Sequence, residues 1–128
     1  MNDALSYSEK KLKFLYDKKL LYLTRMAFYN EEFYKSADTM SEEKLTTYFS
    51  FRNVNFTSLM NVNKTITILH FKLNVDKKLF EEEVIKADKM MNKIIAQDKI
   101  IIEQIKKLKK ELSQGLSKIQ KFENYIRV

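Results

Sequence analysis

One glycine and no proline in 128 residues leave this chain few places at which it can turn tightly. Glycine supplies the left-handed backbone of many turns, and proline interrupts helices and central strands. A chain almost without both, and rich in lysine, glutamate, leucine and isoleucine at helical spacing, favours a few long helices. At this length we expect one all-α domain over residues 1–128.

Two polar breaks divide the chain into predicted helices at about residues 7–37, 42–73 and 77–126. Ser6 is followed by Glu9 three residues later, the spacing of a capping box at the start of the first helix. Thr39 and Glu42 repeat that spacing at the first break. After the second break, Asp76 is the predicted N-cap.

Each predicted helix carries an apolar stripe at the spacing of coiled-coil-like packing. The stripe of the first helix runs through Leu12, Leu15, Tyr16, Tyr22, Leu23, Met26, Tyr29 and Phe33. The predicted seam of the second helix consists of Leu45, Phe49, Arg52, Phe56, Leu59, Asn63, Ile66, His70 and Leu73. The third seam runs through Phe80, Val84, Ala87, Met91, Ile94, Asp98, Ile101, Ile105 and Leu108 and continues to Ile126. We therefore expect an antiparallel bundle of three long helices.

The third predicted helix is longer than the other two. At 1.5 Å per residue, about thirty residues span ~45 Å and about fifty residues span ~75 Å. In an up-down-up bundle, the first two helices therefore cover the third only to about Lys109. The apolar residues beyond that point are Leu112, Leu116, Ile119, Phe122 and Ile126. We expect this C-terminal stripe to meet another chain, as a client-binding site or a homodimer seam, unless the helix breaks near 113–116 and a fourth segment folds back.

Four polar residues occupy seam positions where leucine or isoleucine would be expected. These residues are Arg52, Asn63, His70 and Asp98. A polar seam residue tends to fix the register of packed helices at some cost in stability. The helix lengths place Arg52 and Asp98 at similar heights, so they are predicted to pair, with Lys19 and His70 as the alternative partners of Asp98.

No arrangement of residues indicates a catalytic or cofactor site. Asp98 has no second acid or base at an identifiable spacing, and His70 is the only histidine, without metal-ligand spacing around it. Cysteine is absent, which excludes disulfides, thiolate metal sites and cysteine nucleophiles. The glycine-rich phosphate-binding motifs are also missing. We expect a non-enzymatic protein that uses no metal, cofactor or small molecule.

The net charge of +7 permits contact with nucleic acid or a membrane surface without favouring either. Only three of the 24 basic residues are arginine. The densest basic cluster, residues 106–110, is partly matched, because Glu103 and Glu111 each stand four residues from Lys107. No apolar run approaches the ~20 residues of a membrane span, so we expect a cytoplasmic protein that is not inserted in a membrane.

Three stretches resemble the small helical flagellar type III export chaperones of the FliT and FlgN kind. They are EEKLTTYFSFRNVNFTSLM, MMNKIIAQDKIIIEQIKKLKKELSQGL and KFENYI, within roughly residues 40–126. In that family, a helix after the first break carries spaced leucines and an arginine, which Leu45, Arg52 and Leu59 match. A later helix carries an acidic residue between aliphatic ones, matched by Ile94, Ile95, Asp98, Ile101 and Ile102.

The resemblance implies a chaperone that binds the C-terminal helix of a flagellar cap or hook-associated protein and delivers it to the export gate. It also implies that Tyr125, near the chain end, docks to that gate. Two other functions stay open on the sequence. One is a structural coiled-coil component of a secretion apparatus, and the other is a basic helical regulator that binds nucleic acid or a host protein.

Overall fold

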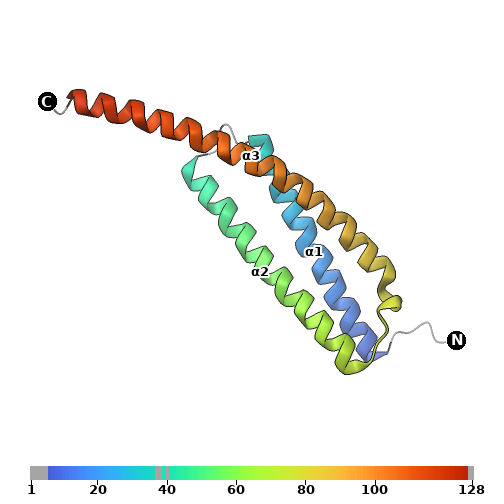
Figure 1. Ribbon diagram of the computed structural model, residues 1–128. Helices are drawn as coiled ribbons and strands as arrows, with labels where there is room; N and C mark the ends of the chain where they lie inside the picture. The colour runs from blue at the N-terminus through green and yellow to red at the C-terminus, as the bar shows by residue number, and fades with distance from the viewer. Residues whose placement is uncertain (1–5, 37–38, 40, 127–128) are drawn as a thin grey trace.

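The computed structural model describes residues 6–36, 39 and 41–126, with the backbone alone at residue 108 and residues 112–126. Its elements are α1 (Tyr7–Ser36), α2 (Glu42–Leu73), the 3-10 helix η2 (Lys77–Phe80) and α3 (Glu81–Ile126). The described residues include no strand. The predicted all-α bundle of three long helices is thereby confirmed (Figure 1).

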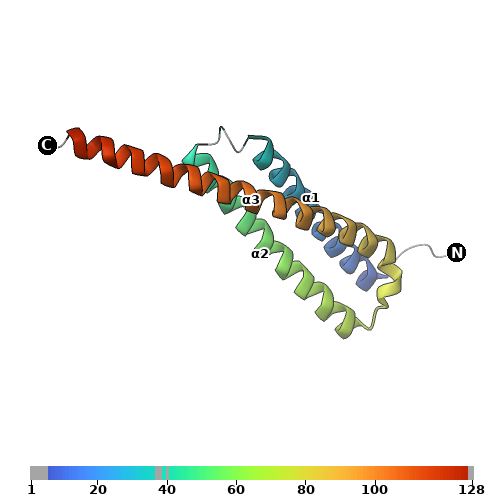
Figure 2. The ribbon, with the colours of Figure 1, turned by 45° about the horizontal axis from the view of Figure 1, so that its top comes forward.

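Helix α1 packs closely along both of the other long helices. In Figure 1, α2 and α3 lie on either side of α1, and in the turned view of Figure 2 α3 crosses in front of α1 while α2 lies apart from α3. The helix begins after Ser6, whose Oγ accepts a hydrogen bond from the Glu9 backbone N–H at 3.1 Å, as the capping-box spacing predicts. Because α2 and α3 both pack against α1, residues of α1 contribute to every part of the core.

Three groups of buried residues follow one another along the bundle. The group next to η2 contains Leu12, Tyr16, Val62, Ile66 and Phe80. The central group contains Leu23, Met26, Ala27, Leu59, Ala87 and Ile94. The third group contains Phe33, Tyr48 and Ile101. Each fully buried large apolar side chain of this kind contributes roughly 1.5–3 kcal/mol to stability, so the three groups hold the helices together along their common length.

The buried stripe of α2 differs from the predicted seam at alternate positions. Leu59, Ile66 and His70 are buried as predicted. Between the shared positions, the buried residues are Tyr48, Asn55 and Val62, each one residue before the predicted Phe49, Phe56 and Asn63. The two stripes share every seventh residue and lie next to each other on the helix. Since α1 is the close partner of α2, the stripe that faces α1 is the buried one, and the predicted phenylalanines lie exposed beside it.

The turn between α1 and α2 corrects one predicted cap. The N-cap of α2 is Ser41, whose side chain accepts a hydrogen bond from the Lys44 backbone N–H at 3.2 Å. The predicted cap, Thr39, instead donates its hydroxyl to the Ser36 carbonyl at 3.2 Å. Both residue types favour helix starts, and the capping-box spacing to Glu42 favoured Thr39, whereas Ser41 is followed three residues later by Lys44.

The turn between α2 and α3 forms as its sequence predicts. Asn74 ends α2 in the left-handed conformation at φ 51°, a position that asparagine tolerates better than most residues. Asp76 is the N-cap of η2, and its Oδ1 accepts from the Lys78 backbone N–H at 2.9 Å. Val75 and Phe80 both pack in the core group next to η2.

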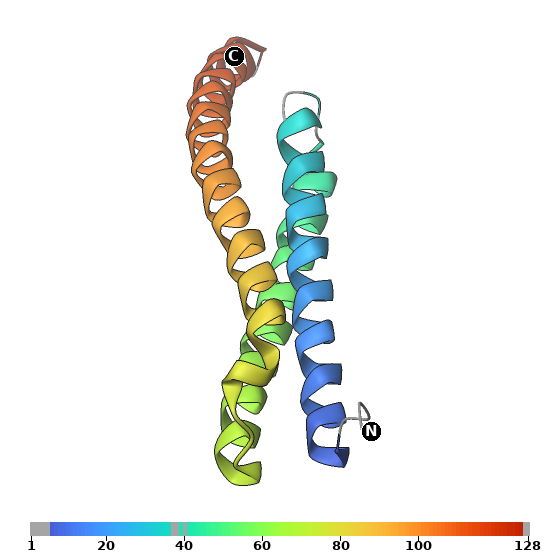
Figure 3. The same ribbon diagram turned by 90° about the vertical axis from the view of Figure 1, so that its right-hand side faces the viewer.

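Helix α3 is one continuous helix of 46 residues. It passes through Gly115 without a break, so the fourth segment considered from the sequence does not form. Figures 1 and 3 show α3 running past the ends of α1 and α2. The side chains of the C-terminal stripe, Leu112, Leu116, Ile119, Phe122 and Ile126, and that of Tyr125, lie outside the described residues. Their predicted roles in client binding and gate docking stay predictions.

Candidate helix-binding face

A network of polar side chains joins the three helices. At its centre is Asn30 of α1, which is only 1% exposed. Its Nδ2 donates to Gln97 Oε1 at 3.3 Å and to Asp98 Oδ1 at 3.2 Å. Its Oδ1 accepts from the Tyr48 hydroxyl at 2.7 Å and from Arg52 Nη1 at 2.9 Å. Because a primary amide has two N–H donors and two lone pairs, every hydrogen-bonding position of Asn30 is used.

The ion pair expected between Arg52 and Asp98 is present, with 2.6 Å between Nη2 and Oδ2. The side chains of the two residues are 27% and 28% exposed. The hydrogen bond that the Arg52 guanidinium donates to Asp98 raises the pKa of Arg52 above its ordinary value, against the opposite effect of burial. The pair therefore links α2 to α3 at a place that solvent still reaches.

Four exposed apolar side chains surround this ion pair. Each charged residue has one apolar residue three positions before it and another four positions after it, and such residues are neighbours on the same side of a helix. The four are Phe49 and Phe56 on α2, which are 37% and 51% exposed, and Ile95 and Ile102 on α3, which are 48% and 50% exposed. We call these four residues, together with the ion pair and the exposed Met60 one turn beyond Phe56, the α2–α3 face.

A half-buried lysine of α1, Lys19, lies near α3. Lys19 stands three residues after Tyr16 and four residues before Leu23, which are both buried, so its Cβ points toward the core. Burial lowers the pKa of the half-buried Lys19, and the charge of Asp88 on α3 acts in the opposite direction. Asp88 stands seven residues before Ile95, in the same row of α3. The Lys19 charge is therefore close to Asp88 and to the row of α3 that contains Ile95.

The remaining predicted seam residues lie away from the ion pair. His70 is buried at the end of α2, with Nδ1 2.8 Å from the Val75 carbonyl and Nε2 2.7 Å from the Tyr16 hydroxyl. Since a carbonyl only accepts, Nδ1 carries the proton, and in the neutral ring Nε2 accepts from Tyr16. Asn63 is half-buried, and its backbone carbonyl accepts a hydrogen bond from Thr67 at 3.0 Å. His70 thus anchors the end of α2 to α1 and to the following turn.

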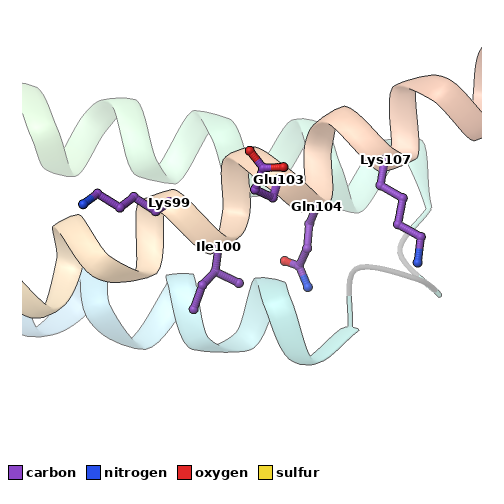
Figure 4. Close-up of a pocket in the computed structure, with 5 residues that line it drawn as sticks. All are labelled: Lys99, Ile100, Glu103, Gln104 and Lys107. Atoms are coloured by element: carbon purple, nitrogen blue, oxygen red, sulfur yellow. The ribbon is translucent and has the colours of Figure 1, made fainter.

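A shallow hollow on α3 offers less to a ligand. Figure 4 shows the five residues that line it, Lys99, Ile100, Glu103, Gln104 and Lys107. Gln104 Nε2 donates to the Tyr34 carbonyl at 3.2 Å, while its buried Oε1 has no hydrogen-bond partner among the described residues. Because one helix supplies the whole lining, the hollow is open, unlike the concave sites that enclose small molecules.

The part of the chain that the structure describes offers neither a metal site nor a membrane span. Among the side chains that it describes, no three histidine or acidic groups are close enough to hold a metal ion. Within the same part of the chain, no helix combines the length and the apolar content that crossing a bilayer requires.

Two buried residues of the network were not identified from the sequence. Asn30 and Gln97 are 1% and 4% exposed, and Gln97 also donates to the Ala27 carbonyl at 3.2 Å. A signal for Asn30 existed, because it continues the spacing of the buried stripe between Met26 and Phe33. Gln97 lies beside the predicted seam rather than on it, so periodicity gave no signal for it.

Comparisons with known proteins do not assign this chain to a family. No protein-family model matches the chain, and neither a curated protein nor a solved structure matches it at a significant level. The function has to be inferred from the α2–α3 face and its surroundings.

Proposed function

We propose that the chain is a non-enzymatic protein that binds an amphipathic helix of another protein along the α2–α3 face. The observation that supports this function is the ion pair with four exposed apolar side chains around it. Contiguous exposed apolar residues mark interaction sites in soluble proteins. A helix that lies between two others presents residues at i, i+3, i+4 and i+7 to such a surface.

The energy of such an interface agrees with a partner that covers several turns. Covering one of these half-exposed side chains contributes roughly 1 kcal/mol, because about half of its surface is already buried. Four of them do not offset the cost of association by themselves. The bound helix therefore extends over Met60 as well, whose flexible side chain can adapt to the shape of a partner.

We further propose that the bound helix belongs to a flagellar cap or hook-associated protein, and that the chain acts in the cytoplasm as its export chaperone. The resemblance supports this narrower function through Arg52 and Asp98, which are the charged residues that carry it. In the structure these two residues form the ion pair at the centre of the α2–α3 face. On this proposal, the C-terminal stripe extends the client contact and Tyr125 docks to the export gate.

A pull-down with a matched pair of variants tests this function. Ile102 and Ile100 are both 50% exposed, but only Ile102 belongs to the α2–α3 face. Tagged wild type, Ile102→Asp and Ile100→Asp would be incubated with nuclease-treated lysate of the native cell and washed at high salt. We expect wild type and Ile100→Asp to retain one exported protein with a helical C-terminus, and Ile102→Asp to lose it. Equal retention by both variants would show that the client binds elsewhere.

A structural coiled-coil component is a second candidate, and the length of α3 favours it. The continuous helix of 46 residues extends past α1 and α2, as a rod that pairs with a second copy would. This alternative predicts a stable homodimer at micromolar concentration, and light scattering would detect it. A monomer under those conditions would leave the helix-binding function as the better explanation.

A further inference from the structure

We infer that the helix bound by the α2–α3 face carries an acidic side chain within its apolar stripe, and that Lys19 receives this side chain. The inference rests on the proposed helix-binding function and adds the chemistry of the bound helix. Three observations support it. Lys19 lies in the buried stripe of α1, it forms no ion pair with any side chain that the structure describes, and the chain carries a net charge of +7.

Lys19 occupies a position in α1 where an apolar residue would pack. The stripe of α1 at 4-3 spacing is Leu12, Tyr16, Lys19, Leu23, Met26, Asn30 and Phe33. Its two polar members differ in their surroundings. Asn30 uses all of its hydrogen-bonding positions, whereas Lys19 forms no ion pair with any side chain that the structure describes. The charge of Asp88 favours the ammonium, but the two residues form no ion pair, and burial lowers the pKa of Lys19 on balance.

The geometry of α1 relates Lys19 to the ion pair. Asn30, which hydrogen-bonds to both Arg52 and Asp98, follows Lys19 by eleven residues, or about 16 Å along the helix. Eleven residues are close to three complete turns, so residues with this separation lie on one side of a helix. A bound helix that runs parallel or antiparallel to α1 therefore contacts both Lys19 and the ion pair. Its acidic residue stands about three turns from the residue that covers the ion pair.

Charge favours a partner protein over a second copy of this chain. The C-terminal stripe is the amphipathic segment that a second copy would offer, and all five of its residues are apolar. Residues 112–126 contain two lysines and one glutamate, and Glu123 is not on the stripe. The chain as a whole carries a net charge of +7. A second copy would therefore bring no carboxylate to Lys19 from that stripe, whereas an acidic helix of another protein would.

Thermal unfolding of the free protein gives a first test. Lys19→Met places an apolar side chain at the seam and should raise the Tm by about 2–4 °C. Lys18→Met, which changes the exposed neighbour, should leave the Tm unchanged. A fall in Tm for Lys19→Met would mean that the lysine stabilises the free fold, and would contradict its assignment to a partner.

Selection from a peptide library tests the acidic contact directly. The probe is a displayed library of 21-residue helical peptides with an apolar stripe, in which each stripe position in turn is Glu, Gln, Lys or Leu. On wild type and Lys18→Met, we expect Glu to be enriched about tenfold over Gln at one position, since one good ion pair is worth about a factor of ten. On Lys19→Met, the same apolar stripe should be selected without preference for Glu.

The outcomes separate this inference from the function on which it rests. Selection of apolar stripes without enrichment of Glu on wild type would overturn the inference and leave helix binding intact. Enrichment that persists with Lys19→Met would also overturn it, because another group would then receive the carboxylate. Failure of wild type to select any amphipathic peptide would overturn the proposed function together with the inference.

Discussion

Asp98 Oδ2 lies 2.6 Å from Arg52 Nη2, and the same two residues hydrogen-bond to opposite ends of the Asn30 side-chain amide. One residue from each long helix thus takes part in a closed set of contacts. The ion pair sets the height of α2 relative to α3, and Asn30 ties both helices to α1. A salt bridge placed in this way determines the arrangement of the helices more than it adds to stability.

Breaking the ion pair from one side should be costly. Asp98→Leu leaves the partly buried Arg52 without its carboxylate, and we expect the free energy of unfolding to fall by about 1–3 kcal/mol. The double variant Arg52→Met/Asp98→Leu should recover part of this loss, since it removes both charges. Urea unfolding followed by circular dichroism would measure both effects. A double variant less stable than Asp98→Leu would show that the charges stabilise the fold in ways other than pairing.

Asn30→Leu should destabilise the protein by about 2–4 kcal/mol, because its buried partners lose their hydrogen bonds at once. Asn53→Leu, an equal change at an exposed position of α2, should alter the free energy of unfolding by less than about 0.5 kcal/mol. Urea unfolding followed by circular dichroism would compare the free energies of unfolding of the two variants. Equal effects of the two substitutions would contradict the central role of Asn30.

The end of α2 depends on the left-handed backbone of Asn74 at φ 51°. Asn74→Ala should lower stability by about 1 kcal/mol, since a Cβ without a local hydrogen-bonding group is disfavoured there. Asn74→Gly should be neutral or slightly stabilising. Thermal melts of the three proteins would rank them, and a ranking with alanine above glycine would contradict the geometry.

Alkaline pH should destabilise the fold through its buried tyrosines. Burial raises the pKa of Tyr16 and that of Tyr48 above the ordinary value near 10. Above pH ~10 the unfolded chain therefore loses these phenol protons before the folded chain does, and the free energy of unfolding falls as the pH rises. The free energy of unfolding continues to fall until the pH exceeds the raised pKa values of Tyr16 and Tyr48 in the folded protein.

Tyr48→Phe separates this effect from the titration of the lysines. The variant is expected to be less stable at neutral pH, because it loses the hydrogen bond to Asn30. Its urea midpoint should nevertheless fall less steeply between pH 9 and pH 11 than that of wild type. Identical slopes in the two proteins would mean that Tyr48 ionises equally easily in both states.

The sequence predicted the parts of this fold that depend on local signals. The long helices follow from helical spacing in a chain without proline, and Asp76 and Ser6 cap helices through short-range hydrogen bonds. The pairing of Arg52 with Asp98 was also predictable, because helix length converts sequence position into height along a bundle.

The parts that were missed depend on where α1 lies. Periodicity allowed two neighbouring stripes on α2, and the larger phenylalanines at positions 49 and 56 favoured the wrong one. The helix instead buries Tyr48, whose hydroxyl reaches Asn30, and Asn55, whose Nδ2 donates to the Phe51 carbonyl at 2.9 Å. Hydrophobic periodicity does not detect residues that are buried because of their hydrogen bonds. The candidate face could therefore be identified only from the structure, which shows which stripe of α2 is buried.

The separation of Asn30 from its partners also bears on how the chain folds during synthesis. Its contact with Tyr48 spans 18 residues, so α1 and α2 can pair as soon as both have left the ribosome. Its contact with Asp98 spans 68 residues, so the amide protons of Asn30 have no carboxylate or glutamine oxygen until α3 follows. In a nascent chain halted before that point, α3 does not cover Asn30, and water takes the place of Gln97 and Asp98 as acceptor of its amide protons. The set of contacts around Asn30 is therefore complete only when the third helix has joined the other two.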